Sequence, residues 1–267
     1  MLNKLRSLSY KYAVISSVVI ALVFYLVYDA VGRLFSIMPE SLVRDFSYQI
    51  LAMIYPLGFV LLFGFASSFK SEKFLKGLGA GLFLLICELL ILFSQLINSS
   101  LDENTVWKPW YLIVYGIVRV VGIAVREEAV FRATIQNILA KKYANSIKGI
   151  WFTAIVSAVI FGLIHAFNIF VGVDVGASLI QAVVNIGVGL LFAAIYLRSA
   201  NIWVMILLHT VTDAAGLFTS LFCSSTVTEV MNGISWQSFA IGAIMVAVAA
   251  FLLRPSKCRE ILARGAQ

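Results

Sequence analysis

The chain has 267 residues, of which 61% are hydrophobic and only 12% are charged, and its net charge is +7. Soluble domains contain about 45–50% apolar and about 25% charged residues, and a chain of this length cannot enclose so much apolar side chain in one core. The composition therefore excludes a soluble enzyme, a disordered regulator and a disulfide-stapled secreted domain. It predicts an all-α bundle of membrane-spanning helices.

Eight apolar segments are long enough to cross a bilayer, which takes about 20 residues. They cover residues 12–31, 50–69, 77–97, 109–139, 148–169, 176–197, 201–222 and 234–253. The connections between them are short, so we expect residues 1–267 to form a single integral membrane domain. No clear small-residue cleavage site follows the first segment, so we expect it to remain as a span and not to be removed as a signal peptide.

The basic residues predict the orientation of these spans. Fourteen of the 20 Lys and Arg residues lie near the two termini or in alternate loops, whereas the opposite loops hold only Arg33, Arg44 and Lys108. Lys and Arg accumulate on the cytoplasmic side of membrane proteins, so we expect both termini in the cytoplasm. The positive charge is then explained by the topology, and we expect no nucleic-acid partner. We expect a multi-pass protein of the cell membrane, in a bacterial plasma membrane.

Ionisable side chains at membrane depth are costly, so each one needs an explanation. The set inside the predicted spans includes both histidines of the chain and consists of Glu88, Arg119, Arg126, Glu127, Glu128, Arg132, His165, His209 and Asp213. A purely structural ion cluster is one interpretation. A polar site with a chemical function is the other, and the gathering of these residues on a few spans favours it.

Spacing along the helices indicates which of these residues share a face. Glu128 and Arg132 are four residues apart, as are His209 and Asp213, and side chains at this spacing are neighbours on a helix. Glu127 is rotated by about 100° from Glu128. We therefore expect one of the two carboxylates to be neutralised structurally while the other faces a cavity.

Two further predictions concern depth and pairing. At a rise of about 1.5 Å per residue, His209 lies about 12 Å and Glu127 about 20 Å from the cytoplasmic ends of their helices, so these depths coincide only if the helices tilt or extend. Arg119 and Arg126 are seven residues apart on one helix face. We expect them to pair with Glu88 or to line a polar groove.

Three short motifs follow one another along these spans. They are EExxxR (Glu127, Glu128, Arg132), FxxxH (Phe161, His165) and HxxxD (His209, Asp213). In order, spacing and topology the pattern resembles the CAAX protease and bacteriocin-processing family of intramembrane proteases, also called the Abi or CPBP family. The motif-bearing region covers about residues 105–222, and the first three spans match only as membrane helices.

The resemblance implies an eight-helix membrane protease whose site opens toward the cytoplasm and whose substrate is a membrane-associated or lipidated peptide or protein. Members trim prenylated CAAX proteins or serve bacteriocin maturation, self-immunity and peptide signalling. It also implies roles for the site residues: Glu127 and His165 activate a water, His209 and Asp213 bind the oxyanion or a metal, and Glu128 and Arg132 hold the site in shape.

Peptide hydrolysis requires an activated water, a stabiliser of the oxyanion and a proton for the leaving amine. No serine or cysteine of the motifs is placed as a nucleophile beside a histidine, which favours direct attack by water. An ionised aspartate would repel an oxyanion, so Asp213 is protonated, orients His209 or binds a metal. Two histidines and a carboxylate form a familiar zinc ligand set, and the candidate ligands of a divalent metal are Glu127, His165, His209 and Asp213.

Three classes of function remain in view. The first is an intramembrane endopeptidase, either a metalloprotease or a metal-independent enzyme. The second is a non-catalytic immunity or scaffold protein of the same fold, and the third is a small transporter, against which the lack of two similar halves weighs. The polar residues Asn168, Gln181 and Asn185 either line a substrate cavity or form hydrogen bonds between helices.

Overall fold

The computed structural model describes residues 2–70 and 72–265, and its regular elements are helices. Within these residues the nearest approach to a β-strand is an isolated bridge between Trp107 and Cys223. The helices are α1 (Leu2–Lys11), α2 (Ala13–Ser36), α3 (Leu42–Ile54), α4 (Leu57–Phe63), η1 (Ala66–Phe69), α5 (Phe74–Leu101), α6 (Trp110–Val130), the π-helix η2 (Phe131–Gln136), α7 (Asn137–Tyr143), α8 (Ile147–Ile164), η3 (His165–Val171), α9 (Val175–Ser199), α10 (Ile202–Gly216), α11 (Phe218–Phe222), α12 (Val227–Asn232), α13 (Ser238–Leu252) and α14 (Pro255–Gly265). The predicted all-α class is confirmed.

Five helical segments of the described chain are long and apolar enough to cross a membrane: α2, residues 42–63 (α3 with α4), α5, residues 147–171 (α8 with η3) and α9. A sixth results if α13 and α14, which bend by 60° at their junction, count as one span. The α6 helix carries four charged residues and α10 has only 15 residues. The protein is thus a multi-pass membrane protein, and the number of eight spans stays a prediction.

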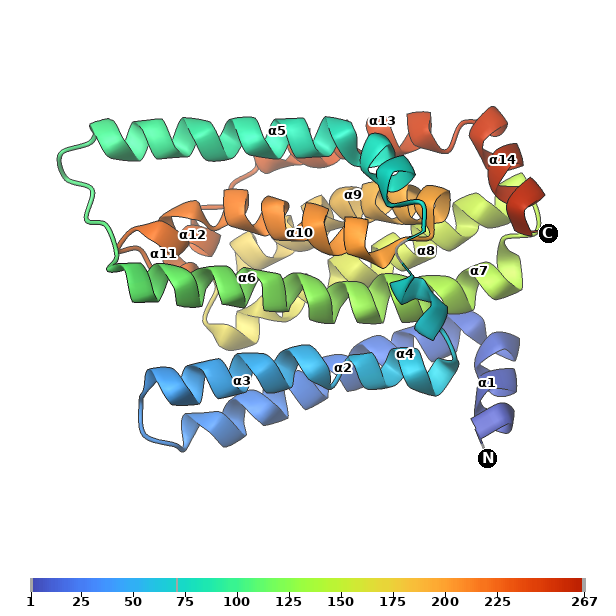
Figure 1. Cartoon of the computed structure of the whole chain (residues 1–267), viewed down its shortest axis with the longest axis horizontal. Coiled ribbons are helices and arrows are strands. Elements are labelled where there is room, and N and C mark those ends of the chain that lie inside the picture. The colour runs from blue at the N-terminus through green and yellow to red at the C-terminus, as the bar shows by residue number, and fades with distance from the viewer. Residues whose placement is uncertain (1, 71, 266–267) are drawn as a thin grey trace.

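The long helices lie side by side, and both ends of the chain lie at the same end of the bundle (Figure 1). The α7–α8 and α9–α10 connections and the segment between α4 and α5 also lie at this end. These connections carry many of the Lys and Arg residues that predict the cytoplasmic side. The arrangement agrees with an even number of crossings, and the cytoplasmic location of the termini stays a prediction.

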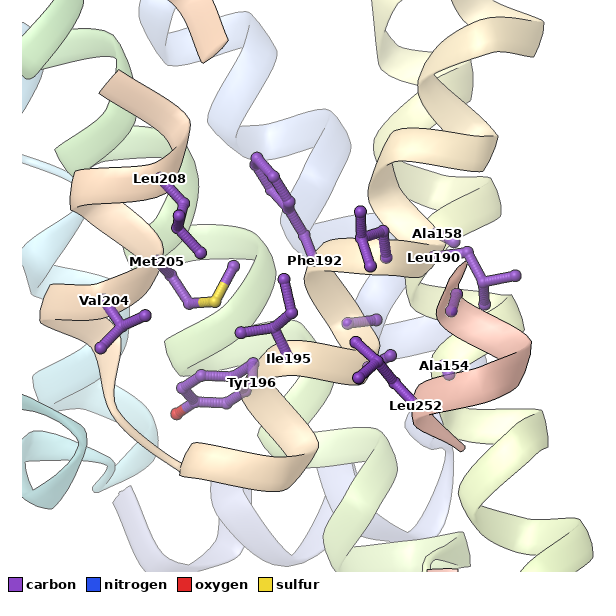
Figure 2. Close-up of a cluster of buried hydrophobic side chains, with 14 of the residues drawn as sticks. Ala154, Ala158, Leu190, Phe192, Ile195, Tyr196, Val204, Met205, Leu208 and Leu252 are labelled. Atoms are coloured by element: carbon purple, nitrogen blue, oxygen red, sulfur yellow. The ribbon is translucent and has the colours of Figure 1, made fainter. Parts of the chain in front are cut away.

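The α9 helix is the centre of the bundle. In its most apolar window 56% of the residues are buried, against 17% in α5, which leaves most of its apolar surface for lipid. Side chains from three other helices pack against those of α9 (Figure 2). The labelled ones are Ala154 and Ala158 of α8, Leu190, Phe192, Ile195 and Tyr196 of α9, Val204, Met205 and Leu208 of α10, and Leu252 of α13.

A glycine sets the close approach of α8 to α9. A Cβ atom at Gly162 would lie 2.6 Å from the Ala182 carbonyl oxygen and 2.7 Å from the Ile186 amide nitrogen. Because both are backbone atoms, Gly162→Ala would push the helices apart and cost about 1–3 kcal/mol. We expect a lower midpoint of thermal unfolding in detergent for this variant.

A matched variant separates this contact from a general effect of alanine. Gly79 lies inside α5, and a Cβ atom there meets nothing within 4 Å. Gly79→Ala should leave the unfolding midpoint unchanged or raise it slightly, because alanine is the better helix former. Equal midpoints for the two variants would contradict the tight α8–α9 contact.

Candidate active site

The candidate site lies between α6 and α10. Glu127 and Glu128 occupy the last turn of α6, and His209 lies opposite them on α10. The start of α10 is fixed by Asn201, whose side chain accepts a hydrogen bond from the Val204 amide at 3.1 Å and donates one to the Glu72 carbonyl oxygen at 2.8 Å. This anchor sets the position of His209 two turns further on.

His209 lies between the two carboxylates. Its Nδ1 atom is 2.7 Å from Glu128 Oε1, and its Nε2 atom is 3.8 Å from Glu127 Oε2. An ionised carboxylate only accepts hydrogen bonds, so Nδ1 donates its hydrogen to Glu128. The ring orientation is thereby fixed, with Nε2 directed toward Glu127 and toward Asp213 Oδ1 at 3.6 Å. That last distance is too long for a direct hydrogen bond and leaves an electrostatic contact.

Glu128 and Arg132 form the buried ion pair that their spacing predicts. Arg132 Nη1 lies 3.4 Å from Glu128 Oε1, and both side chains are fully enclosed. The Arg132 guanidinium packs over the ring of Phe161 at 4.3 Å and over that of Phe192 at 5.2 Å. These aromatic faces stabilise a cation that has no access to water. Phe192 also contacts the His209 ring, and no sequence motif had indicated it.

Glu127 differs from its neighbour in exposure and bonding. Its side chain is 15% exposed, whereas that of Glu128 is 0% exposed. The Oε2 atoms of both glutamates have no hydrogen-bond partner, but Oε1 of Glu128 accepts from His209 and contacts Arg132. The two adjacent carboxylates therefore lie in different surroundings: Glu128 is enclosed in an ion pair, and Glu127 is partly exposed beside a histidine.

His165 stands where α8 ends and the tighter helix η3 begins. Its Nδ1 atom is 2.8 Å from the Phe161 carbonyl oxygen. Since a carbonyl only accepts, Nδ1 carries the hydrogen and Nε2 remains a free acceptor. The Phe161 ring contacts both the His165 ring, at a centroid distance of 4.9 Å, and the His209 ring, at 6.0 Å. The phenylalanine of the FxxxH motif thus lies next to both histidines.

The depth estimated from sequence was misleading for His209 and Glu127. The estimate separated them by about 8 Å, given the helical rise, yet the structure places their polar atoms 3.8 Å apart. Helix ends do not mark a common plane, because the chain continues as helix beyond Glu127 through η2 and α7 to Tyr143. Counting residues from the nearest lysine therefore overstated the offset.

A π-helix follows the two glutamates directly. In η2 the Thr134 hydroxyl donates to the Ala129 carbonyl oxygen at 2.9 Å. Just beyond, Gln136 Nε2 donates to the Ala193 carbonyl oxygen at 2.8 Å and Asn137 Nδ2 to the Tyr196 hydroxyl at 3.0 Å. These bonds tie the segment to α9. Single π-turns inside α-helices occur frequently at functional sites.

The predicted pairing of Glu88 with Arg119 or Arg126 was wrong. Among the described residues neither arginine has a carboxylate within ion-pair distance. Glu88 is buried on α5, which packs along α10. Arg126 lies instead over the ring of Tyr28 on α2, at 4.6 Å. Glu88 and the two arginines thus form no ion pair with one another.

Two of the polar residues considered for a substrate cavity bind each other. Asn168 Nδ2 donates to Gln181 Oε1 at 2.6 Å, joining η3 to α9. This supports the interpretation as a hydrogen bond between helices. Asn185 is half-buried on α9.

The described part of the chain contains no preformed group of side chains that could bind a metal ion. No three His, Cys, Asp or Glu side chains there converge closely enough to hold a metal ion. The predicted set of Glu127, His165, His209 and Asp213 therefore does not fit a resident zinc as it stands.

The helical membrane fold and the buried carboxylate–histidine cluster agree with the family comparison. Residues 108–215 match the family model of the type II CAAX prenyl endopeptidases, Rce1-like. This segment contains all six predicted site residues and lies within the predicted motif-bearing region. The match supports an intramembrane protease of the CAAX type.

The predicted resemblance to the CAAX-type proteases is thus confirmed over residues 108–215. The comparisons with curated proteins and with solved structures gave no significant match.

Proposed function

We propose that the protein hydrolyses a peptide bond of a lipidated or membrane-associated peptide, with Glu127 as the general base. The observation that carries the proposal is the contrast between the two glutamates. Each glutamate has one oxygen without a hydrogen-bond partner, but Glu128 is fully enclosed and its Oε1 atom contacts both Arg132 and His209. Glu127 is 15% exposed, and its unbonded Oε2 atom lies 3.8 Å from His209 Nε2. Such an acceptor in a polar site inside a membrane protein is suited to hold and deprotonate a water molecule.

In the proposed reaction the water oxygen attacks the carbonyl carbon of the substrate while Glu127 takes one of its protons. His165 accepts a hydrogen bond from the same water through its free Nε2 atom. When the C–N bond breaks, Glu127 returns the proton to the leaving amine, so the products are a carboxylic acid and an amine. The enzyme forms no covalent intermediate.

His209 is proposed to act as the doubly protonated imidazolium, which donates Nδ1–H to Glu128 and stabilises the oxyanion through Nε2–H. The hydrogen bond from Nδ1 to Glu128 holds the ring, so the donor is already oriented before the substrate arrives. Asp213, at 3.6 Å from Nε2, is proposed to support the charge on His209 and not to contact the oxyanion, which an ionised carboxylate would repel. Glu128 and Arg132 then act as positioning residues.

The experiment uses the full chain reconstituted in liposomes with a prenylated peptide that carries a fluorophore and a quencher on either side of the scissile bond. We expect cleavage to yield one new amino terminus, identified by mass spectrometry. A bacteriocin-type or signal peptide of the same length is the second substrate to offer. Failure to cleave any of them would instead favour the non-catalytic immunity or scaffold role.

Removal of divalent metals gives an independent result. Because no three described ligand side chains converge on a metal position, we expect the initial rate to stay unchanged in chelator and on return of zinc. Elemental analysis of the purified protein should find less than one metal per chain. A rate that falls in chelator and recovers with zinc would contradict this mechanism and restore the metalloprotease interpretation.

A further inference from the structure

An arginine next to the proposed general base has no anionic partner. Arg126 is 7% exposed on α6, one residue before Glu127. Within residues 2–70 and 72–265, no carboxylate lies within 4.0 Å of its guanidinium and no hydrogen bond to it is present. Arg132, six residues further on, is fully enclosed but paired with Glu128. A buried cation without a counter-ion is costly at membrane depth.

A tyrosine that is itself packed against a second tyrosine contacts this arginine. The Arg126 guanidinium lies over the ring of Tyr28 at 4.6 Å, and the Tyr28 ring is 5.9 Å from that of Tyr48 on α3. Contact with this ring restricts where the guanidinium can lie, while its N–H donors, which make no hydrogen bond among the described residues, remain able to bind an anion. The cation is therefore pre-organised and still lacks an acceptor.

One turn of α2 contacts both Arg126 and the segment that follows His165. Tyr25 and Tyr28 are three residues apart and share a helix face. The Tyr25 hydroxyl donates to the Phe167 carbonyl oxygen at 3.4 Å, and the two rings lie 4.6 Å apart. Phe167 follows His165 by two residues in η3. One side of the candidate site is thus bounded by α2, with Arg126 on the α6 side of that boundary and His165 on the η3 side.

We propose that Arg126 binds a carboxylate of the peptide substrate, namely its free C-terminal carboxylate, and so positions the chain against Glu127. The inference rests on the proposed protease function. A guanidinium forms paired, charge-assisted hydrogen bonds with a carboxylate, and a peptide offers this group at its C-terminus or on Asp and Glu side chains. Occupation by the carboxylate would supply the missing counter-ion. Arg126 is then a residue that determines substrate specificity and takes no part in the proton transfers.

The test compares three forms of one quenched prenylated peptide: the free acid, the C-terminal amide, and the amide with an Asp side chain at the last position. We expect wild type to cleave the free acid with a kcat/KM about 10- to 100-fold above that of the amide, as for the loss of a charged hydrogen bond. The difference should lie mainly in KM. Recovery with the Asp peptide would assign the subsite to carboxylates in general, and no recovery would assign it to the C-terminus itself.

Arg126→Gln should lose this discrimination. We expect it to cleave the free acid as slowly as wild type cleaves the amide, and the amide at the wild-type rate. Arg119→Gln is the matched control, because Arg119 lies seven residues earlier on the same face of α6 and is also unpaired among the described residues. It should keep the preference for the free acid.

Several outcomes separate the subsite from the proposed function. If wild type cleaves acid and amide equally, the subsite is wrong while the protease function stands, and this result does not depend on any variant. If Arg126→Gln slows both peptides by the same factor, the role of Arg126 is structural. If wild type cleaves none of the peptides, the protease function fails and the subsite with it.

Discussion

Replacement of Glu127 by alanine or glutamine is expected to lower the rate of peptide cleavage by about 10²- to 10⁴-fold, as for loss of a general base. The loss should fall on kcat, because the carboxylate acts on the water and does not bind the peptide. Its Oε2 atom makes no hydrogen bond and its side chain is partly exposed. The folded protein should therefore survive the change, with an unaltered elution profile and unfolding midpoint.

The control for Glu127 is a glutamate outside the site. Glu103 lies exposed in the connection between α5 and α6, and Glu103→Ala should leave the rate at the wild-type value. An active Glu127→Gln variant would refute the assignment of the base. A Glu127→Gln variant that unfolds at a lower temperature than wild type would point to a structural role for this carboxylate.

Replacement of Arg132 by alanine is expected to destabilise the protein by about 3–5 kcal/mol, because it leaves the enclosed Glu128 carboxylate without its cation. The void between Phe161 and Phe192 adds to this loss. The measurement is the midpoint of thermal unfolding in detergent, together with the amount of folded protein recovered from membranes. Activity should fall as well, because His209 loses a firmly held partner.

A paired variant distinguishes the ion pair from simple loss of volume. In Arg132→Met with Glu128→Gln, no charge is left unpaired, and the longer side chains keep most of the contacts with the two phenylalanine rings. We expect it to be markedly more stable than Arg132→Ala. Equal destabilisation by both would show that the cost comes from packing and not from the stranded carboxylate.

The surroundings of the two adjacent glutamates therefore predict different phenotypes. Loss of Glu127 leaves a folded, inactive protein, whereas loss of Arg132, the ion-pair partner of Glu128, leaves a poorly folded one. The sequence predicts that they differ, because a helix turns about 100° between them. It does not say which one is buried, because that depends on the neighbours that α9 and α10 supply.

The spacing of residues within a single helix predicts some contacts of the candidate site and does not predict others. The pair Glu128–Arg132 and the shared face of His209 and Asp213 follow from a spacing of four residues within one helix. The contact of His209 with Glu127 and Glu128 joins residues about 80 positions apart and was reached only through the resemblance to a family. Phe192 has no distinguishing signal, since it is one apolar residue in an apolar helix.

The charged residues of α6 make this helix harder to identify as a membrane span from hydropathy. Apolar length predicts α2, α5 and α9 directly. The α6 helix holds its site residues in an otherwise apolar segment, and so it departs from the composition of an ordinary membrane helix. The helix that carries both glutamates is thus not among the five segments that length and hydropathy select.

The π-helix η2 lies between α6 and α7 and sets how the side chains of one helix are rotated about the helix axis relative to those of the other. Upstream, the glutamates face α10, and downstream, Gln136 and Asn137 bond to α9. A π-turn accommodates one residue more than an α-turn. Deletion of Thr134 would therefore keep every apolar side chain of this segment, yet it would rotate the glutamates by about 100° relative to Gln136 and Asn137 and so turn them away from His209.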